Sequence, residues 1–359
     1  MRRFECQACG QTLDFANVQC ESCGRALGFL PDRLDLSALE PEGDVFRPLA
    51  DPERRVRYCV NFAHGACNWT VDDGSAEELC RCCRHNRTIP DLSVDGNLAL
   101  WQRMERAKHL LFYSLIRLGL PLRTRDEEPK TGLAFDFLDP AAAPEPVMTG
   151  HDEGLITLNL AEADDAEREK RRGELGEPYR TLLGHFRHEV AHHFWNVLVR
   201  DAGRTDAFRA VFGDESADYG DALAVHYRDG PKPDWQNAFV SAYAASHPWE
   251  DFAETFAHYL HIVDTLETAR AFGLGVRAPI GGETPLKRGV TFDPYEATAA
   301  DLVEAWVPLT FAINSINRSM GQPDLYPFVL SAPVEAKLEA IRELVRAGAG
   351  QPGPAAAGG

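Results

Sequence analysis

The chain has 359 residues and a formal net charge of −18, because 55 acidic residues outnumber 37 Lys and Arg residues. This balance disfavours non-specific binding to nucleic acid or to an anionic membrane. No segment reaches the ~18 consecutive apolar residues of a membrane span, and the first residues carry no apolar run typical of a signal peptide. We therefore expect a cytoplasmic protein of two or three domains that does not bind membranes, and the charge balance argues against nucleic acid as a partner.

All 9 cysteines lie before residue 84, and in a chain with no secretion signal this clustering favours metal binding over disulfides. The first four form two C-x-x-C pairs, each followed by glycine: Cys6 with Cys9, and Cys20 with Cys23. Four thiolates at this spacing suit one tetrahedral structural zinc ion. The alternative, a redox C-x-x-C, normally has a single pair on a βαβ unit. We predict a zinc ribbon over residues 1–30.

A mixed, proline-containing stretch over residues 31–57 is expected to be a connector to a second cysteine-rich module over residues 58–90. In that module a second structural zinc would be held by Cys59, Cys67, Cys80 and Cys83. Cys82 lies between the two ligands of a C-x-x-C pair and is the spare cysteine. His64 and His85 compete for a place in the site. The alternative is a set of buried free thiols beside Trp69.

The stretch Thr181–Trp195 contains the pattern H-E-x-x-H at His188–His192. Apolar residues recur around it at steps of three and four, which predicts an amphipathic helix. Residues four apart share one face of a helix, so both imidazoles can reach one ion. Glu189 can then take a proton from a water on that ion. The alternative is a packing helix whose histidines are only hydrogen-bonded. His185 and His193 lie off the pair and are not expected to bind metal.

A catalytic zinc site needs three protein ligands and one open position. The segment from Pro248 reads as a second helix, on which Glu250 and Glu254 are four residues apart. Two stacked carboxylates on an inward face are unfavourable unless a cation compensates them. Asp214, in an apparent loop, is the alternative third ligand. His258 and His261 on the same helix are expected to pack or to face solvent.

The H-E-x-x-H helix followed by the pattern E-x-F-A-E-x-F resembles gluzincin metallopeptidases, including the lethal-factor-like branch. The resemblance implies that Glu250 is the third zinc ligand, that Glu254 orients a ligating histidine, and that Tyr243 lies near the zinc-bound water. From Cys6 to about Phe328 the chain is also similar to a bacterial family of zinc-binding metallopeptidases with an N-terminal zinc ribbon. Its markers here include Cys-Asn-Trp, Phe-Gly-Asp-Glu and Trp-Glu-Asp-Phe-Ala-Glu-Thr-Phe.

Around these motifs the sequence predicts helices over residues 98–118, 293–320 and 334–346, and strands over 133–138 and 155–160. The second strand could be an edge strand with which an extended peptide pairs, or a plain sheet strand. Residues 269–289 are expected to be a loop, and residues 346–359 a disordered tail. The expected fold is an α+β, zincin-like catalytic domain over residues 91–345, mostly helical with a small sheet.

These features predict a zinc-dependent metallopeptidase with one catalytic zinc, one or two structural zincs, and peptides or proteins as substrates. Zinc held by His188, His192 and Glu250 would activate a water, with Glu189 as general base and Tyr243 steadying the oxyanion. Two alternatives stay open. The chain could be a non-catalytic zinc-binding protein whose ribbon recruits a protein partner. It could also be a protease recruited by its ribbon to nucleic-acid-bound proteins, through a local patch of Arg81, Arg84 and Arg87.

Overall fold

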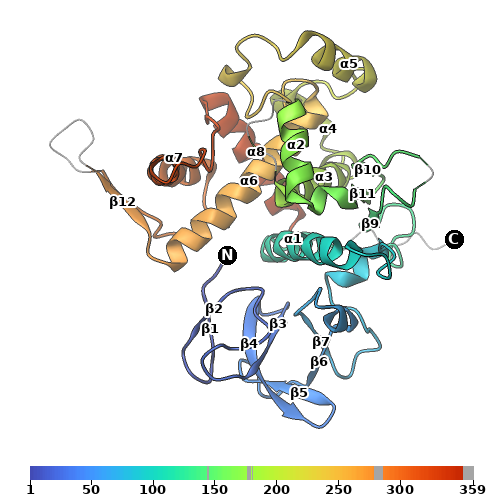
Figure 1. Ribbon diagram of the computed structural model, residues 1–359. Helices are drawn as coiled ribbons and strands as arrows, with labels where there is room; N and C mark the ends of the chain where they lie inside the picture. Colours follow the sequence, from blue (N-terminus) through green and yellow to red (C-terminus); the bar gives the residue numbers. More distant parts are fainter. Residues whose placement is uncertain (144, 176–178, 180, 279–285, 351–359) are drawn as a thin grey trace. The chain divides into compact units, whose positions relative to one another are not determined.

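The computed structural model describes residues 1–143, 145–175, 179, 181–278 and 286–350 (Figure 1). The chain divides into two compact units: Arg2–Arg117 with Leu122–Glu174, and Met1 with Leu118–Pro121 and Leu175–Gly359. Over the described residues it forms eight α-helices and four small sheets, which confirms the α+β class. Among those helices, none is both long and apolar enough to cross a membrane. The domain boundaries expected from the sequence stay predictions.

The strands next to the cysteine pairs belong to the first unit. A hairpin of β1 (Phe4–Glu5) and β2 (Thr12–Leu13) precedes an antiparallel sheet of five strands in chain order: β3 (Ala26–Leu30), β4 (Asp35–Glu42), β5 (Val45–Pro48), β6 (Val56–Tyr58) and β7 (Thr70–Asp72). Residues 31–57, expected to be a connector, therefore lie largely in strands. Residues 36–39 of β4 are all buried, so the alternation that identifies a half-exposed strand is missing.

An aromatic core joins this sheet to the long helix α1 (Asn97–Arg117) within the first unit. Phe29 of β3 packs on Trp69 with ring centroids 4.7 Å apart, and on Phe15 at 4.9 Å. Tyr113 of α1 contacts Phe15 at 5.9 Å. Since these rings come from both cysteine modules and from α1, the unit folds around a single core that the metal sites border.

The second sheet of this unit has the strand order β10 (Gly150–Asp152), β11 (Leu155–Asn159), β9 (Ala134–Leu138) and β8 (Asn86–Thr88). β11 pairs antiparallel with β10 and parallel with β9. The expectation that residues 155–160 form an edge strand is therefore wrong. Three-residue β10 covers the side on which a peptide would have paired.

The charged helix α2 (Asp165–Leu175) follows this sheet. The unit also contains three short 3-10 turns, η1 (Val60–His64), η2 (Cys83–His85) and η3 (Leu160–Ala163).

The second unit is helical. Its helices are α3 (Leu182–Trp195), α4 (Thr205–Phe212), α5 (Tyr219–Asp229), α6 (Pro248–Ala271), α7 (Ala299–Ser319) and α8 (Ala332–Gly348), with a π-helical turn η4 (Asn196–Arg200) and a 3-10 turn η5 (Trp235–Asn237). The expected loop over 269–289 instead carries the hairpin of β12 (Gly275–Ala278) and β13 (Leu286–Gly289). The expected tail begins inside α8, and residues 351–359 lie outside the described residues.

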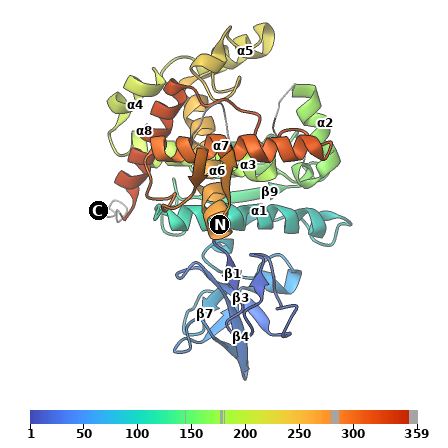
Figure 2. The same ribbon diagram turned by 90° about the vertical axis from the view of Figure 1, so that its left-hand side faces the viewer.

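The helices α3 and α6 pack against each other in the middle of this unit, and α7 crosses α6 (Figures 1 and 2). Phe194 of α3 stacks on Phe256 of α6 with centroids 5.7 Å apart and planes inclined by 17°. The start of α6 is fixed by Pro248 in the first turn and by the His247 side chain, which accepts a hydrogen bond from the backbone N–H of Trp249 at 3.1 Å. The first turn of α6 therefore faces the middle of α3.

Candidate metal centre

The two histidines of the H-E-x-x-H pattern lie one turn apart on α3, as the sequence predicts. Thr181 caps this helix and accepts a hydrogen bond from the N–H of Gly184 at 3.0 Å. The Nε2 atoms of His188 and His192 lie 3.2 Å apart. Both imidazoles therefore present one nitrogen to the same point.

Glu250 comes from the first turn of α6 and closes the cluster. Its Oε2 lies 3.0 Å from Nε2 of His188 and 3.6 Å from Nε2 of His192. This oxygen is buried and accepts no hydrogen bond from any residue that the structure describes. Three ligands about 2.1 Å from a tetrahedral zinc ion lie about 3.4 Å from one another, so the spacing fits this metal. A cation would satisfy the otherwise unpaired oxygen.

A second carboxylate on α6 sets the orientation of His188. Nδ1 of His188 lies 2.7 Å from Oε1 of Glu254, and Oε2 of Glu254 accepts a hydrogen bond from the Ser241 hydroxyl at 2.7 Å. Because a carboxylate only accepts, we assign the proton to Nδ1, which leaves the Nε2 lone pair facing Glu250. Burial opposes ionisation of Glu254, but the hydrogen bond from His188 brings the pKa of Glu254 below its usual value.

The carboxyl group of Glu250 is also held in its charged form. Burial works against the carboxylate, yet the neighbouring imidazoles of His192 and His188 hold the pKa of Glu250 well below its usual value. A bound cation would act in the same direction. The cluster is therefore built to present an ionised oxygen beside two imidazole nitrogens.

Two further residues that the sequence singles out border this cluster. Glu189 is half-buried and forms no hydrogen bond or ion pair with the described residues. Burial raises the pKa of its carboxyl group. The ring of Tyr243 lies 5.9 Å from that of His188, and burial together with the charge of Glu250 raises the pKa of Tyr243. Glu189 is thus a free acceptor, and Tyr243 stays protonated as a hydrogen-bond donor.

Tyr219, the first residue of α5, belongs to the site although the sequence reasoning missed it. Its hydroxyl donates to Oε1 of Glu250 at 2.7 Å. Trp249 lies over the ring of His192 with centroids 3.8 Å apart. The Tyr219 hydroxyl thus holds one oxygen of Glu250, and the other oxygen faces the imidazoles. The position of Tyr219 after the helix cap Asp218 carries no signal of this contact.

The other candidates near this site lie elsewhere. Asp214 is exposed and accepts hydrogen bonds from the backbone and hydroxyl of Ser216, at 3.0 and 2.7 Å. His258 is bonded through Nδ1 to the hydroxyl of Tyr326 at 2.7 Å, and Nδ1 of His261 accepts from Arg187 at 2.6 Å. None of the three joins the cluster of His188, His192 and Glu250.

The first cysteine cluster has the geometry of a closed zinc site. Sγ of Cys6 lies 3.7 Å from Sγ of Cys23, and Sγ of Cys9 lies 3.6 Å from Sγ of Cys20. Sulfurs about 2.3 Å from a tetrahedral zinc lie about 3.8 Å apart, whereas a disulfide would bring them to about 2.05 Å. The glycines after each pair, at φ 75° and 72°, allow the turns that direct the thiols inward.

The second cluster brings Cys59, Cys67, Cys80 and Cys83 together, all buried, with Sγ of Cys67 3.7 Å from Sγ of Cys80. Of the competitors, His64 is exposed, and Nδ1 of His85 is bonded to the carbonyl of Leu133 at 2.8 Å. The spare Cys82 is buried and stands outside the four, close to Glu105 and His109.

His109 of α1 is a neighbour of this cluster that the sequence did not indicate. Its Nε2 lies 3.2 Å from Sγ of Cys67 and 3.7 Å from Sγ of Cys83. Four thiolates around one zinc ion leave a net charge of about −2, which is costly to bury without a compensating donor. His109 can supply that donor. Inside an apolar helical pattern, a single histidine gives no sign of such a role.

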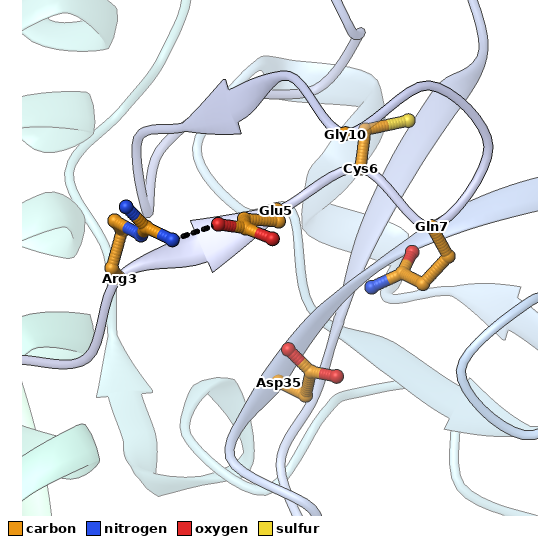
Figure 3. Close-up of a pocket in the computed structure, with 6 residues that line it drawn as sticks. All are labelled: Arg3, Glu5, Cys6, Gln7, Gly10 and Asp35. Carbon is orange, nitrogen blue, oxygen red and sulfur yellow. Dashed lines mark hydrogen bonds and ion pairs between the residues drawn. The ribbon is translucent and has the colours of Figure 1, made fainter.

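A shallow hollow lies beside the first cysteine cluster and is shown in Figure 3. An ion pair of Arg3 with Glu5 forms one side, and Asp35 and Gln7 lie across from it. The sulfur of Cys6 points away from both carboxylates in this view. The hollow therefore has no ligand set of its own, and the chemistry of this region belongs to the thiols.

Comparisons with known proteins identify two domain families in this chain. The model of a zinc-ribbon domain family matches residues 3–94. The model of a family described as "Putative zinc-binding metallo-peptidase" matches residues 97–344. Uncharacterized proteins of Mycobacterium bovis and Mycobacterium tuberculosis are each 44% identical over 349 residues, which cover 96% of this chain and 95% of the relative. No solved structure matches the chain. The resemblance noted from the motifs is confirmed: the chain belongs to this zinc-binding metallo-peptidase family, and a zinc-ribbon domain precedes its peptidase domain.

Proposed function

We propose that this chain is a zinc-dependent peptidase that hydrolyses peptide bonds, with His188, His192 and Glu250 as ligands of its catalytic zinc. The observation that carries the proposal is the buried Oε2 of Glu250, which faces two imidazole nitrogens at 3.0 and 3.6 Å and accepts no hydrogen bond from the described residues. The lone pairs of the two imidazole nitrogens and of the carboxylate oxygen would repel one another in this buried place, so a cation between them is required. Family membership supports zinc as that cation.

A zinc ion held there supplies Lewis acidity, which makes a water molecule acidic enough to attack a carbonyl near neutral pH. Glu189 is the general base: its carboxylate accepts the proton of the attacking water and then delivers it to the leaving amine. No described residue forms an ion pair or hydrogen bond with Glu189, which supports this role because none of them competes for its oxygens.

The remaining residues of the site orient the proposed zinc ligands and stabilise the oxyanion. Tyr243 donates a hydrogen bond to the oxyanion that forms on the substrate carbonyl, and its raised pKa keeps the proton in place. Glu254, fixed by the Ser241 hydroxyl at 2.7 Å, holds the tautomer of His188. Tyr219 holds the carboxylate of Glu250 at 2.7 Å. These groups need little rearrangement during the reaction, which is where preorganised sites gain their rate.

Two structural zinc ions complete the proposal, one in each cysteine cluster. The Sγ distances of 3.6 and 3.7 Å in the first cluster, and 3.7 Å in the second, support tetrahedral thiolate sites.

The arginine patch considered for nucleic acid has fewer unpaired positive charges than the sequence suggests. Arg87 is paired with Asp136 through its Nε at 2.9 Å. Peptides and proteins are therefore the proposed substrates.

The test uses two substitutions of similar size, Glu189→Gln and Glu250→Gln, in the full chain. Zinc is counted by mass spectrometry, and hydrolysis is followed on a mixture of unstructured peptides. Glu189→Gln should keep three zinc ions per chain and lose hydrolysis by roughly 10³-fold, the middle of the range for a general base. Glu250→Gln should lose one zinc ion together with hydrolysis, while the two cysteine-bound ions stay.

The paired result separates this function from its alternative. Three zinc ions in the wild-type protein without hydrolysis of any peptide would favour a non-catalytic zinc-binding protein. Full hydrolysis in the Glu189→Gln protein would exclude this residue as the base.

A further inference from the structure

A cavity of about 300 Å³ lies beside the proposed catalytic centre, within the second unit. One wall is the helix α5, through Ala222, Val225 and His226. The opposite wall is the backbone turn after Tyr243, through Ala245 and Ser246. None of these residues has a role in the proposed chemistry, so the function of the cavity is open.

Aromatic contacts place this cavity next to the metal ligands. The ring of His226, which lines it, lies 5.9 Å from the ring of Tyr243. Tyr243 in turn lies 5.9 Å from the ring of His188. A peptide whose scissile carbonyl meets Tyr243 would therefore extend a neighbouring side chain toward the cavity, since adjacent side chains of an extended chain are only a few ångströms apart.

The helix α5, which forms one wall of the cavity, is anchored next to the proposed metal ligands. At the start of α5, the Tyr219 hydroxyl donates to Glu250 at 2.7 Å, and its ring lies 5.6 Å from that of Trp249. No residue of α5 is buried, and Val225 is 46% exposed. An exposed aliphatic side chain that lines a cavity beside a reactive centre gains burial when a ligand fills the cavity.

The lining sets the chemical class of the occupant. Methyl groups of Ala222, Val225 and Ala245 form the walls, which favours an aliphatic group. Asp221 and Lys232 stand at the rim with opposite charges, so neither sign of charge is favoured overall. The volume is at the lower end of the roughly 300–1,000 Å³ of ligand pockets, which suits one side chain rather than a large ligand.

We infer that this cavity is a substrate subsite that binds one uncharged, medium-sized aliphatic side chain of the peptide, next to the bond that is cleaved. The inference rests on the proposed function and adds its selectivity. The cavity then acts as a sieve: branched aliphatic residues fill it, whereas glycine leaves it empty and charged residues would lose their hydration.

Two matched variants test the subsite. Ala222→Phe fills the cavity, while Ala224→Phe places the same ring on an exposed position of α5 outside the lining. The probe is a set of fluorescent peptides with Gly, Ala, Val, Leu, Asp or Lys at successive positions. Mass spectrometry of the products locates the cleaved bond. Binding of the same peptides to each variant combined with Glu189→Gln is measured by fluorescence anisotropy.

In the wild-type protein, one position beside the cleaved bond should prefer Val and Leu over Gly by at least about 10-fold in kcat/KM, the discrimination that an apolar pocket provides. Ala222→Phe should remove this preference and keep the zinc content. Ala224→Phe should keep both. An unchanged preference in Ala222→Phe would overturn the subsite while leaving the peptidase function intact.

A wild-type protein that cleaves no peptide would refute the proposed function, and the binding arm then decides the subsite alone. Preferential binding of Val and Leu peptides that Ala222→Phe abolishes would support it. Equal binding of all the peptides would overturn it.

Discussion

The cysteine clusters and the cluster between α3 and α6 differ in how many ligands they offer one ion. Each cysteine cluster provides four sulfurs, enough to enclose a tetrahedral zinc completely. The cluster of His188, His192 and Glu250 provides three atoms, which leaves one position for water. Under the proposed function, the same metal would hold the fold where protein ligands fill its coordination sphere and would perform chemistry where one position is open.

The two cysteine clusters differ in how deeply their cysteines are buried. In the first, Cys9 is exposed and Cys23 half-buried, whereas all four sulfur ligands of the second are buried. The buried cluster borders the core around Trp69, whose ring lies 5.0 Å from that of His109. Loss of its metal would leave several thiols and their charge compensation unpaired inside that core.

The largest expected effect is therefore on stability, from Cys80→Ser. Structural zinc ions contribute on the order of 10 kcal/mol of binding free energy to folding, so this variant should lose one zinc ion and the cooperative unfolding of the first unit. Near-UV circular dichroism, thermal unfolding and zinc counting would measure the effect.

Cys82→Ser is the matched control, since Cys82 is equally buried and only two residues away. It should keep all three zinc ions, with a loss of about 1 kcal/mol in the free energy of unfolding, as expected for a buried polar change. If Cys82→Ser loses a zinc ion and Cys80→Ser does not, the assignment of ligand and spare cysteine is reversed.

The parts of the site on strongly patterned helices could be predicted from the sequence. Phe186, Val190 and Phe194 recur at helical steps, so α3 and its two histidines follow from periodicity. Glu250 follows from Pro248 at a helix start and from the stacked carboxylates, which make sense only beside a cation. The Phe194–Phe256 contact brings the two helices together, and neither segment of the sequence indicates it by itself.

A second prediction sharpens the contrast between histidines inside and outside the metal cluster. His258 is buried on α6, two turns after Glu250, where burial lowers the pKa of its imidazole from 6.5 to about 4 although Glu254 opposes this. The native state then excludes a proton that the unfolded state takes up below pH 6.5. Stability is full above pH 6.5 and falls by up to about 3 kcal/mol as the pH decreases to 4.

His258→Gln removes this titration but retains a polar partner for the Tyr326 hydroxyl, which lies 2.7 Å from His258 in the native protein. Urea unfolding of both proteins between pH 4 and 7 gives the difference, in which acid loss of zinc is common to both. The wild-type protein should lose about 3 kcal/mol more than the variant over this interval. Parallel curves would contradict the buried neutral histidine.

The smallest expected effect concerns the support of the open site. Tyr219→Phe deletes the hydroxyl that donates to Glu250 at 2.7 Å, a contact of the kind that contributes 10- to 100-fold to metal affinity. The catalytic zinc should therefore bind roughly 10- to 100-fold more weakly. The cysteine-bound ions should be unaffected. Competition with a fluorescent chelator measures the three ions separately.

Tyr227→Phe, near the other end of α5, is the control and should leave all zinc affinities unchanged, because Tyr227 is 65% exposed and the hydroxyl that donates to Glu250 belongs to Tyr219. Equal weakening in both variants would mean that α5 acts only as a packed helix. Unchanged affinity in Tyr219→Phe would show that the hydroxyl does not position the ligand.

Tyr219 and the strands of the first unit illustrate what the sequence leaves out. No residue of α5 is buried, so an apolar stripe that could have indicated the contact of Tyr219 with Glu250 is missing. In β4, burial of four successive residues hides the alternation of a strand, and residues 31–57 therefore resembled a connector. In both cases the deciding partner comes from a distant part of the chain.

The helix α6 carries the proposed ligand Glu250 and, on the same face, Glu254, which is bonded to Nδ1 of His188. Each residue of an α-helix turns by about 100°, so one residue inserted between these two positions would swing Glu254 away from His188 while leaving Glu250 in place. The same insertion just after α6 would disturb neither. Length variation among members of this family should therefore be absent between Glu250 and Glu254 and tolerated beyond Phe272, where the helix ends.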